Sequence, residues 1–563
     1  MTNSLLWLFL VPLALWLVWR IHVRLRLSRA KHPSLAGHVR MAKRVARLIP
    51  TYEFASDRFF SVDGAPEAVS ARRRSGFAQL ARHFRTTRPR SIAAMADLSE
   101  QVPDVAFIAR YQVPFQFSGQ VRTQLKPGVM VERSAGVRLT DIDGNQWLDL
   151  GGAYGVNVFG YDFYKVCLRQ AAATAGDLGP VLGPYHPVIS DVVERLRVIS
   201  GHEQVSFHMS GTEAVMQAVR MARYHTGRSH VVRFCGAYHG WWDEVQPGIG
   251  NPGRVGQVYT LAEMSEATLA VLATRKDIAC VLVNPMQALH PNSNAPGDGA
   301  LVAAGRHTGF DRAAYTDWLK RLREVCSARG IVLIFDEVFV GFRLAQGGAQ
   351  EWLGVQADLV TYGKTLGGGL PVGVVCGPER LMRRYREDRP LDICFARGTF
   401  NAHPWVLAAM QAFLERLEQP GIQEIYSNLD DTWARRAERL NQALNDAELP
   451  VDASHLGSIF TLTYRKPSRY NWMFQFYLNA EGLMLPWVGT GRLIFSLNYS
   501  EAEFDEVVER IVRAGRRMNA DGWWWLPEGA TQRSVSRQVL VELIKARFQR
   551  ASASSPSTVT IGS

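Results

Sequence analysis

The sequence predicts an α/β fold built around a mostly parallel sheet. Between residues 160 and 395, helical stretches alternate with continuous apolar runs, of which the clearest are 231–234, 279–284, 331–337 and 357–363. Strands that are apolar on both faces and are separated by helices are typical of a parallel sheet covered on both sides. With 563 residues, the chain is also too long for one ordinary domain.

The chain opens with an uncharged apolar run, residues 4–19, followed by a series of basic residues from Arg20 to Lys31. A secretory signal would carry its charge before the run, not after it. By the positive-inside rule, we expect residues 1–31 to be a single membrane-spanning anchor that leaves the main body of the protein on the cytoplasmic face. A helix lying in the plane of the membrane is the alternative.

The flanks of the predicted sheet differ from it in composition. We expect residues 32–125 to be a basic, helical extension and residues 521–563 to be a basic tail that is partly disordered. Residues 126–164 and 396–520 are expected to form one smaller α+β domain beside the large domain of residues 165–395. The net charge of +12 suits a membrane surface or a nucleic acid, but no nucleic-acid-binding motif accompanies it, so we expect no nucleic-acid partner.

Two residues at predicted strand ends suggest chemistry. Asp336 ends a strongly apolar strand, where ligand sites of α/β sheets lie, and a buried carboxylate there needs a partner such as a protonated pyridine nitrogen. Lys364 ends the next strand and precedes a glycine-rich turn. A lysine partly removed from water in this way is easier to hold neutral, as Schiff-base chemistry requires.

A third element predicts an anion site. Ser210, Gly211 and Thr212 open a long amphipathic helix, and the free N–H groups at such a helix start can bind a phosphate. Simple capping of the helix by Ser210 is the alternative, and both can hold together.

The segments SGTEAVMQAVRMAR, GAYHGW, FDEVFVGFR and YGKTLGGGLPVG resemble the class III aminotransferases of pyridoxal phosphate (PLP) fold type I, nearest to the glutamate-1-semialdehyde aminomutase branch. The resemblance covers about residues 133–518. It implies a fold type I large domain, PLP as cofactor and no metal. Lys364 would bind PLP covalently and then act as general acid and base, while Asp336 would pair with the ring nitrogen.

The resemblance implies further cofactor contacts. Gly211 and Thr212, with Ser210 at the start of the helix, would bind the phosphate. Tyr238 would stack on the ring with His239 beside it, and Gln287 would lie near the 3-oxygen. Thr399 would reach the phosphate of a neighbouring subunit, which implies a homodimer. Each of these four residues also has a structural alternative. Tyr238 could be a core residue, His239 a structural histidine, Gln287 a hydrogen-bonding residue at a strand end and Thr399 a turn residue.

Two positions depart from the family pattern and argue against glutamate-1-semialdehyde as substrate. Asn284-Pro285 replaces Glu-Pro, and the stretch 152–155 lacks the branch's tryptophan. Residues 288–313 form a lengthened loop that could reshape the entrance. We therefore expect an aminotransferase that moves an amine from a small-molecule donor to an aldehyde or ketone acceptor, lipidic or carrier-bound, at a membrane surface. An aminomutase and a catalytically idle scaffold are the alternatives.

Overall fold

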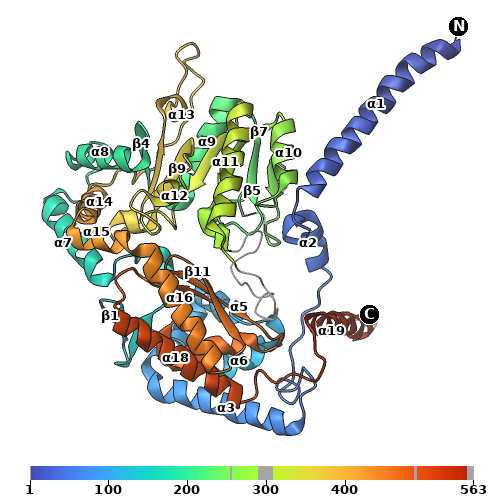
Figure 1. Cartoon of the computed structure of the whole chain (residues 1–563), viewed down its shortest axis with the longest axis vertical. Coiled ribbons are helices and arrows are strands. Elements are labelled where there is room, and N and C mark those ends of the chain that lie inside the picture. Colours follow the sequence, from blue (N-terminus) through green and yellow to red (C-terminus); the bar gives the residue numbers. More distant parts are fainter. Residues whose placement is uncertain are drawn as a thin grey trace, which may run out of the picture. The chain divides into compact units, whose positions relative to one another are not determined.

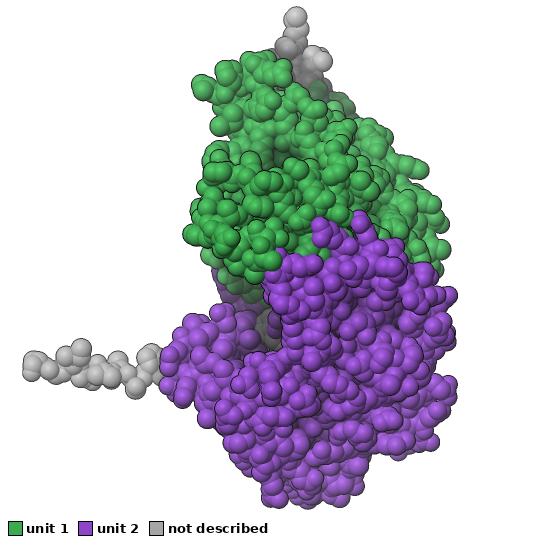
Figure 2. Space-filling model, turned by 90° about the vertical axis from the view of Figure 1, so that its left-hand side faces the viewer, with its two compact units in different colours: residues 1–43, 171–294, 311–414 green, residues 44–170, 295–310, 415–563 purple. Residues whose placement is uncertain are grey.

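The computed structural model describes residues 2–33, 35–246, 248–253, 256–289, 309–486 and 491–553. The chain forms two compact units, shown in Figure 2, each assembled from separate stretches of sequence. Unit 1 comprises residues 1–43, 171–294 and 311–414, and unit 2 comprises residues 44–170, 295–310 and 415–563. Residues 554–563, within the tail for which we predict partial disorder, lie outside the described residues.

Unit 1 is built on a seven-stranded sheet, which confirms the predicted α/β fold. In spatial order its strands are β4 (Gln204–His208), β10 (Gly373–Gly377), β9 (Leu359–Gly363), β8 (Val332–Asp336), β7 (Ile278–Val283), β5 (His230–Phe234) and β6 (Val258–Leu261). From β9 to β6 all neighbours are parallel, and only β10 runs against both of its neighbours. The carboxyl ends of the parallel strands therefore meet at one edge.

Helices pack along this sheet, as Figure 1 shows for α9 and α11. The helices of the large unit and its borders are α7 (Tyr161–Ala175), α8 (Val188–Ser200), α9 (Gly211–Thr226), α10 (Glu266–Thr274), α11 (Arg312–Arg329), α12 (Gly348–Leu353), α13 (Glu379–Met382) and α14 (Pro404–Leu417). The buried face of α9 is made of small and medium apolar residues, including Ala214, Ala218 and Ala222, which let the helix lie close to the strands.

The expected membrane anchor is wrong. Residues 2–29 form a single helix, α1 (Thr2–Arg29), that runs through the apolar run and on into the basic flank. Among the described residues, no helix combines the length and the apolar character needed to cross a bilayer. Over the side chains described from Leu10 onward, the stretch to Leu27 already contains Arg20, Arg24 and Arg26, and charged groups are expensive in the bilayer interior. The prediction of a single-pass membrane location therefore fails.

Unit 2 contains two small sheets and the helices around them. One sheet has the order β1 (Val131–Ala135), β2 (Arg138–Asp141), β3 (Gln146–Asp149) and β13 (Leu483–Met484), and the other has β11 (Val451–Leu456), β12 (Ile459–Tyr464) and β14 (Arg492–Ile494). The helices are α3 (Glu67–Thr87), α4 (Pro89–Gln101), α5 (Pro103–Tyr111), α6 (Ser118–Gln124), α15 (Pro420–Ser427), α16 (Leu429–Asp446), α17 (Phe474–Ala480), α18 (Glu501–Ala520) and α19 (Gln532–Ala553). A short helix, α2 (Val39–Ala46), spans the sequence border between the units.

Buried ion pairs attach both ends of the chain to the body of unit 2. The guanidinium of Arg73, which is fully buried on α3, binds both carboxylate oxygens of Asp63 at 2.9 and 2.7 Å and lies 4.4 Å from the ring centre of Tyr470. On α19, the carboxylate of Glu542 pairs with Arg58 at 2.9 Å and with Arg469 at 2.8 Å. The Arg58 side chain is 56% exposed, but the other charged groups of these pairs have little contact with water.

We predict that Arg73→Ala lowers the free energy of unfolding by about 3–5 kcal/mol, because it leaves the carboxylate of Asp63 buried without its partner. Arg74→Ala is the matched control. The neighbouring Arg74 pairs with Glu67 where both side chains are largely exposed, so its loss should change stability by no more than about 0.5 kcal/mol. Chemical denaturation measures both. Equal effects of the two substitutions would contradict the importance of the buried pair.

Candidate active site

Asp336 and Lys364 lie at the carboxyl edge of the seven-stranded sheet. Asp336 is the last residue of β8, and Lys364 directly follows the neighbouring parallel strand β9, where Asp336 is in register with Thr361. Asp336 is buried. Lys364 has a φ of +48°, in the left-handed region that side chains other than glycine seldom adopt. Strain of this kind often occurs where a side chain must be held in one orientation.

The carboxylate of Asp336 has a defined partner on each oxygen. Oδ2 lies 2.8 Å from Nδ1 of His239, whose side chain is fully buried, and Oδ1 accepts the backbone N–H of Val338 at 3.2 Å. Within the described residues, Nε2 of His239 is buried without a hydrogen-bond partner. The structure therefore places His239 against the carboxylate, where it can orient Asp336.

The amine of Lys364 lies in a weakly solvated environment. Burial lowers the pKa of Lys364, the Arg343 guanidinium lowers it further, and the Asp336 carboxylate opposes both effects. The Nζ atom lies 5.4 Å from the ring centre of Phe339. A lysine with a lowered pKa is neutral over a wider pH range and can therefore act as a nucleophile.

The predicted phosphate-binding turn packs directly against this edge. The Ser210 hydroxyl caps α9 by accepting the N–H of Glu213 at 3.2 Å, so the capping alternative holds in the structure. A Cβ on Gly211 would lie 2.5 Å from Cγ1 of Val338, and a Cβ on Gly240 would lie 2.5 Å from Oγ1 of Thr212. Glycine at both positions lets the turn approach the Asp336 segment and the loop after β5.

Amide side chains at the end of β7 hold the loop that carries Tyr238. Asn284 donates through Nδ2 to the carbonyl oxygen of Tyr238 at 3.0 Å, and Gln287 donates through Nε2 to the carbonyl oxygen of Cys235 at 3.3 Å. Tyr238 is about half exposed, and the partial burial of its hydroxyl, followed by the negative charge of Asp336, raises the pKa of that hydroxyl. Asn284 thus supports the loop, a contact that the sequence did not reveal.

Three remaining predictions concern Thr399, the stretch 152–155 and the entrance loop. Thr399 is exposed on a turn of unit 1, and its contact with a neighbouring subunit stays a prediction. The stretch 152–155 belongs to unit 2, where Ala153 and Tyr154 have φ of +45° and +56°. Residues 290–308, most of the predicted entrance loop, lie outside the described residues.

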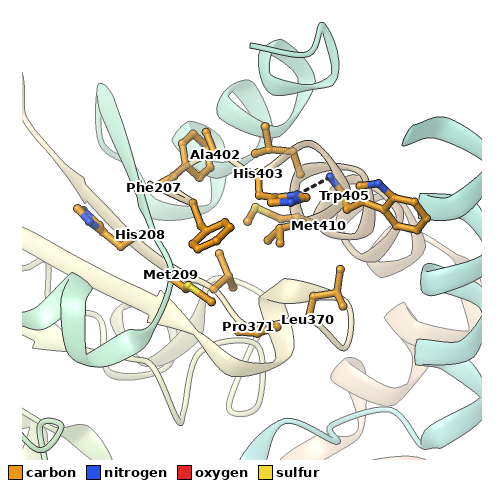
Figure 3. Close-up of a pocket in the computed structure, with 13 residues that line it drawn as sticks. Phe207, His208, Met209, Leu370, Pro371, Ala402, His403, Trp405 and Met410 are labelled. Atoms are coloured by element: carbon orange, nitrogen blue, oxygen red, sulfur yellow. Dashed lines mark hydrogen bonds between the residues drawn. The ribbon is translucent and has the colours of Figure 1, made fainter. Parts of the chain in front are cut away.

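An apolar pocket of about 330 Å³ opens where β4 ends and β10 begins. Figure 3 shows Phe207, Met209, Leu370, Pro371, His403 and Trp405 around it. Its lining includes Met209, which directly precedes Ser210, but none of the predicted cofactor-binding residues.

Comparison with known proteins identifies the family. The sequence pattern of "Aminotransferase class-III" matches residues 120–243 and 305–514. The chain belongs to the class III aminotransferases. Fold type I and PLP as the cofactor, both predicted from the sequence, are confirmed by this membership and by similar solved structures that hold PLP or its amine form, PMP.

The relatives of this class III aminotransferase are named for different activities. The "Glutamate-1-semialdehyde 2,1-aminomutase" of Desulfotalea psychrophila is 34% identical over 63% of this chain and 80% of its own length. A solved "Transaminase with PLP bound" is 28% identical, with a TM-score of 0.59, and the match covers 70% of this chain and 92% of that one. A glutamate-1-semialdehyde aminomutase structure from Pseudomonas aeruginosa has a TM-score of 0.64 at 20% identity, over 80% of this chain and 99% of that one, and supports the fold alone.

The residues at the sheet edge fit PLP. They offer an amine with a lowered pKa, a buried carboxylate for the ring nitrogen, and the first N–H groups of α9 for the phosphate. His239, which we predicted to lie beside the ring, contacts the carboxylate of Asp336 in the folded chain, and its contact with the cofactor stays a prediction. The GAYHG motif marked this histidine, but only the folded chain shows which atom it contacts.

We predict that borohydride fixes PLP onto Lys364 and onto no other lysine, as peptide mapping would show. Because the pKa of Lys364 is lowered, capture of PLP by the apoprotein should reach half its maximal rate below pH 10.5, the ordinary lysine value. Lys364→Ala should abolish the label, and Lys320→Ala, which changes an exposed lysine, should not. A label on another residue would sink the role given to Lys364.

Asp336→Asn should keep the fold but reduce turnover by about 100-fold, because a neutral amide cannot stabilise a protonated ring nitrogen. The control is Asp358→Asn. Asp358 precedes β9 at the opposite edge and pairs with Arg323, so its loss should affect stability more than turnover. Steady-state kinetics of both variants test this, and turnover by Asp336→Asn within twofold of wild type would disprove the role.

Proposed function

We propose that this class III aminotransferase moves an amino group between carbon atoms of one small molecule, as an aminomutase does. The observation that carries the proposal is the similarity to curated relatives named as glutamate-1-semialdehyde aminomutases, which are 31% to 34% identical to this chain. From the sequence we expected transfer of the amine to a separate acceptor. These relatives, together with an intact Lys364 and Asp336 pair, favour the aminomutase alternative. Neither the fold nor the relatives support a membrane surface or a lipidic acceptor.

Bound PLP supplies an electron sink that makes protons on the carbon next to the amine acidic. The chain's own residues then direct the reaction. Asp336, oriented by His239, would pair with the ring nitrogen. Lys364, whose amine has a lowered pKa, would hold the cofactor and would accept and return the proton at the carbon next to the substrate amine. Tyr238 offers the ring an exposed aromatic face.

The substrate in this proposal is a small molecule with both an amine and a carbonyl group. Asn284 replaces the glutamate of the family pattern, and its amide donates to the carbonyl oxygen of Tyr238. This supports a substrate related to glutamate-1-semialdehyde but different from it. The active form in our proposal is a homodimer, in which Thr399 reaches the phosphate of the neighbouring subunit.

A second candidate is intermolecular transamination, supported by the solved transaminase at 28% identity. The two activities use the same cofactor residues and differ in whether a separate amino donor is consumed. An idle scaffold would have no need for a buried carboxylate paired with histidine beside a lysine of lowered pKa.

We predict that the enzyme, loaded with PLP or PMP, converts an amino aldehyde homologous to glutamate-1-semialdehyde to its isomer without any added donor. Product should exceed enzyme by many equivalents, because the amine returns to the same molecule. Chromatography of the amine products measures this, with Lys364→Ala as the inactive control. Conversion that stops near one equivalent and resumes only with a separate amine would support the transaminase instead.

A further inference from the structure

The acid that follows Asp336 has an unusual environment. Glu337 is 1% exposed, and both of its carboxylate oxygens accept backbone N–H groups in the first turn of α12. Oε2 accepts from Ala349 at 2.6 Å and Oε1 accepts from Gln350 at 3.0 Å. Burial raises the pKa of Glu337 to about 8, and these two N–H groups oppose the rise. The roles described so far make no use of this side chain.

The chain makes room for the carboxylate at one glycine. Gly348 has a φ of +74°, and a Cβ placed on it would lie 2.0 Å from Oε2 of Glu337. Any side chain at this position would therefore displace the carboxylate. Gly354, at the other end of α12, has a similar φ of +62°, but a Cβ there would meet nothing within 4 Å.

The backbone of Glu337 is fixed as firmly as its side chain. Its N–H donates to the carbonyl oxygen of Thr361 at 2.9 Å, and its own carbonyl oxygen accepts the N–H of Gly341 at 2.8 Å. The turn that starts here presents Val338 to the phosphate-binding glycine, Gly211, and presents Phe339 to the amine of Lys364. Movement of Glu337 would therefore disturb both of these contacts together.

We propose that Glu337 is a positioning residue for cofactor binding, which ties the turn after β8 to α12 and so holds Asp336, Val338 and Phe339 in place. The inference rests on the roles proposed for Lys364 and Asp336. Glu337 does not touch the reacting atoms in this account. It acts through the turn, because its two N–H contacts can be kept only while residues 337–339 stay where they are.

The test compares Glu337→Gln with Glu351→Gln in the full-length apoprotein. Glutamine keeps the size of Glu337 but turns an amide donor toward one of the two N–H groups, so a buried hydrogen bond is lost. Above pH 8, where Glu337 is ionised, PLP should bind Glu337→Gln at least about tenfold more weakly, measured by titration of the cofactor absorbance. Glu351 also accepts a backbone N–H, that of Gly347 at 2.6 Å, but it is exposed, so Glu351→Gln should bind PLP as the wild type does.

Two further measurements separate positioning from general stability. The pH midpoint of the bound-cofactor absorbance should shift in Glu337→Gln, because the surroundings of the Lys364 amine change. Gly348→Ala should weaken PLP binding in the same way, whereas Gly354→Ala, with similar backbone strain and open space, should not. This glycine pair decides the matter if Glu337→Gln does not fold.

The proposal is overturned if Glu337→Gln binds PLP with wild-type affinity and an unchanged pH midpoint. It is also overturned if the two glycine variants behave alike. Failure of this proposal is distinct from failure of the proposed function. Borohydride labelling of Lys364 in the wild type and the donor-free isomer assay test the function, and neither depends on Glu337.

Discussion

A negative charge buried at the end of an apolar strand is the constraint on which the rest of this site depends. Asp336 follows four residues of β8 that are all buried, and a carboxylate in such surroundings is unfavourable unless every oxygen has a partner. The histidine after β5, the N–H of Val338 and, in the loaded enzyme, the ring nitrogen provide those partners. Three features bring other parts of the site toward this carboxylate. They are the close contacts of Gly211 and Gly240, the hydrogen bond from Asn284 to the Tyr238 loop and the strained backbone of Lys364.

The sequence was sufficient to predict the features that depend on order along the chain. Apolar runs between helices predicted the parallel sheet, and the positions of Asp336 and Lys364 at two successive strand ends predicted that they would be neighbours, since parallel strands end at the same edge. The start of α9 at Gly211 could be predicted in the same way, because Ser210 is a typical capping residue.

The sequence was insufficient where a contact joins distant residues through single atoms. The hydrogen bond from Asn284 to Tyr238 spans 46 positions, and no periodicity indicates it. The prediction of a membrane anchor was wrong for a different reason. The apolar run was considered as a separate segment, whereas α1 continues through Arg20 to Arg29 without a break. The choice between aminomutase and transaminase was also out of reach, because both depend on the same cofactor residues and differ in side chains that contact substrate.

The pairing of Glu542 with Arg58 and Arg469 has a consequence for how the protein is made. A ribosome releases the N-terminal part of a chain first, and the two arginines leave the exit tunnel long before α19 does. Until α19 has been synthesised, Arg469 has no carboxylate to pair with. Burial of the Arg469 charge without that partner would be unfavourable. This part of unit 2 can therefore close only once α19 has left the ribosome, so a nascent chain that still lacks α19 would present an open, positively charged surface to chaperones.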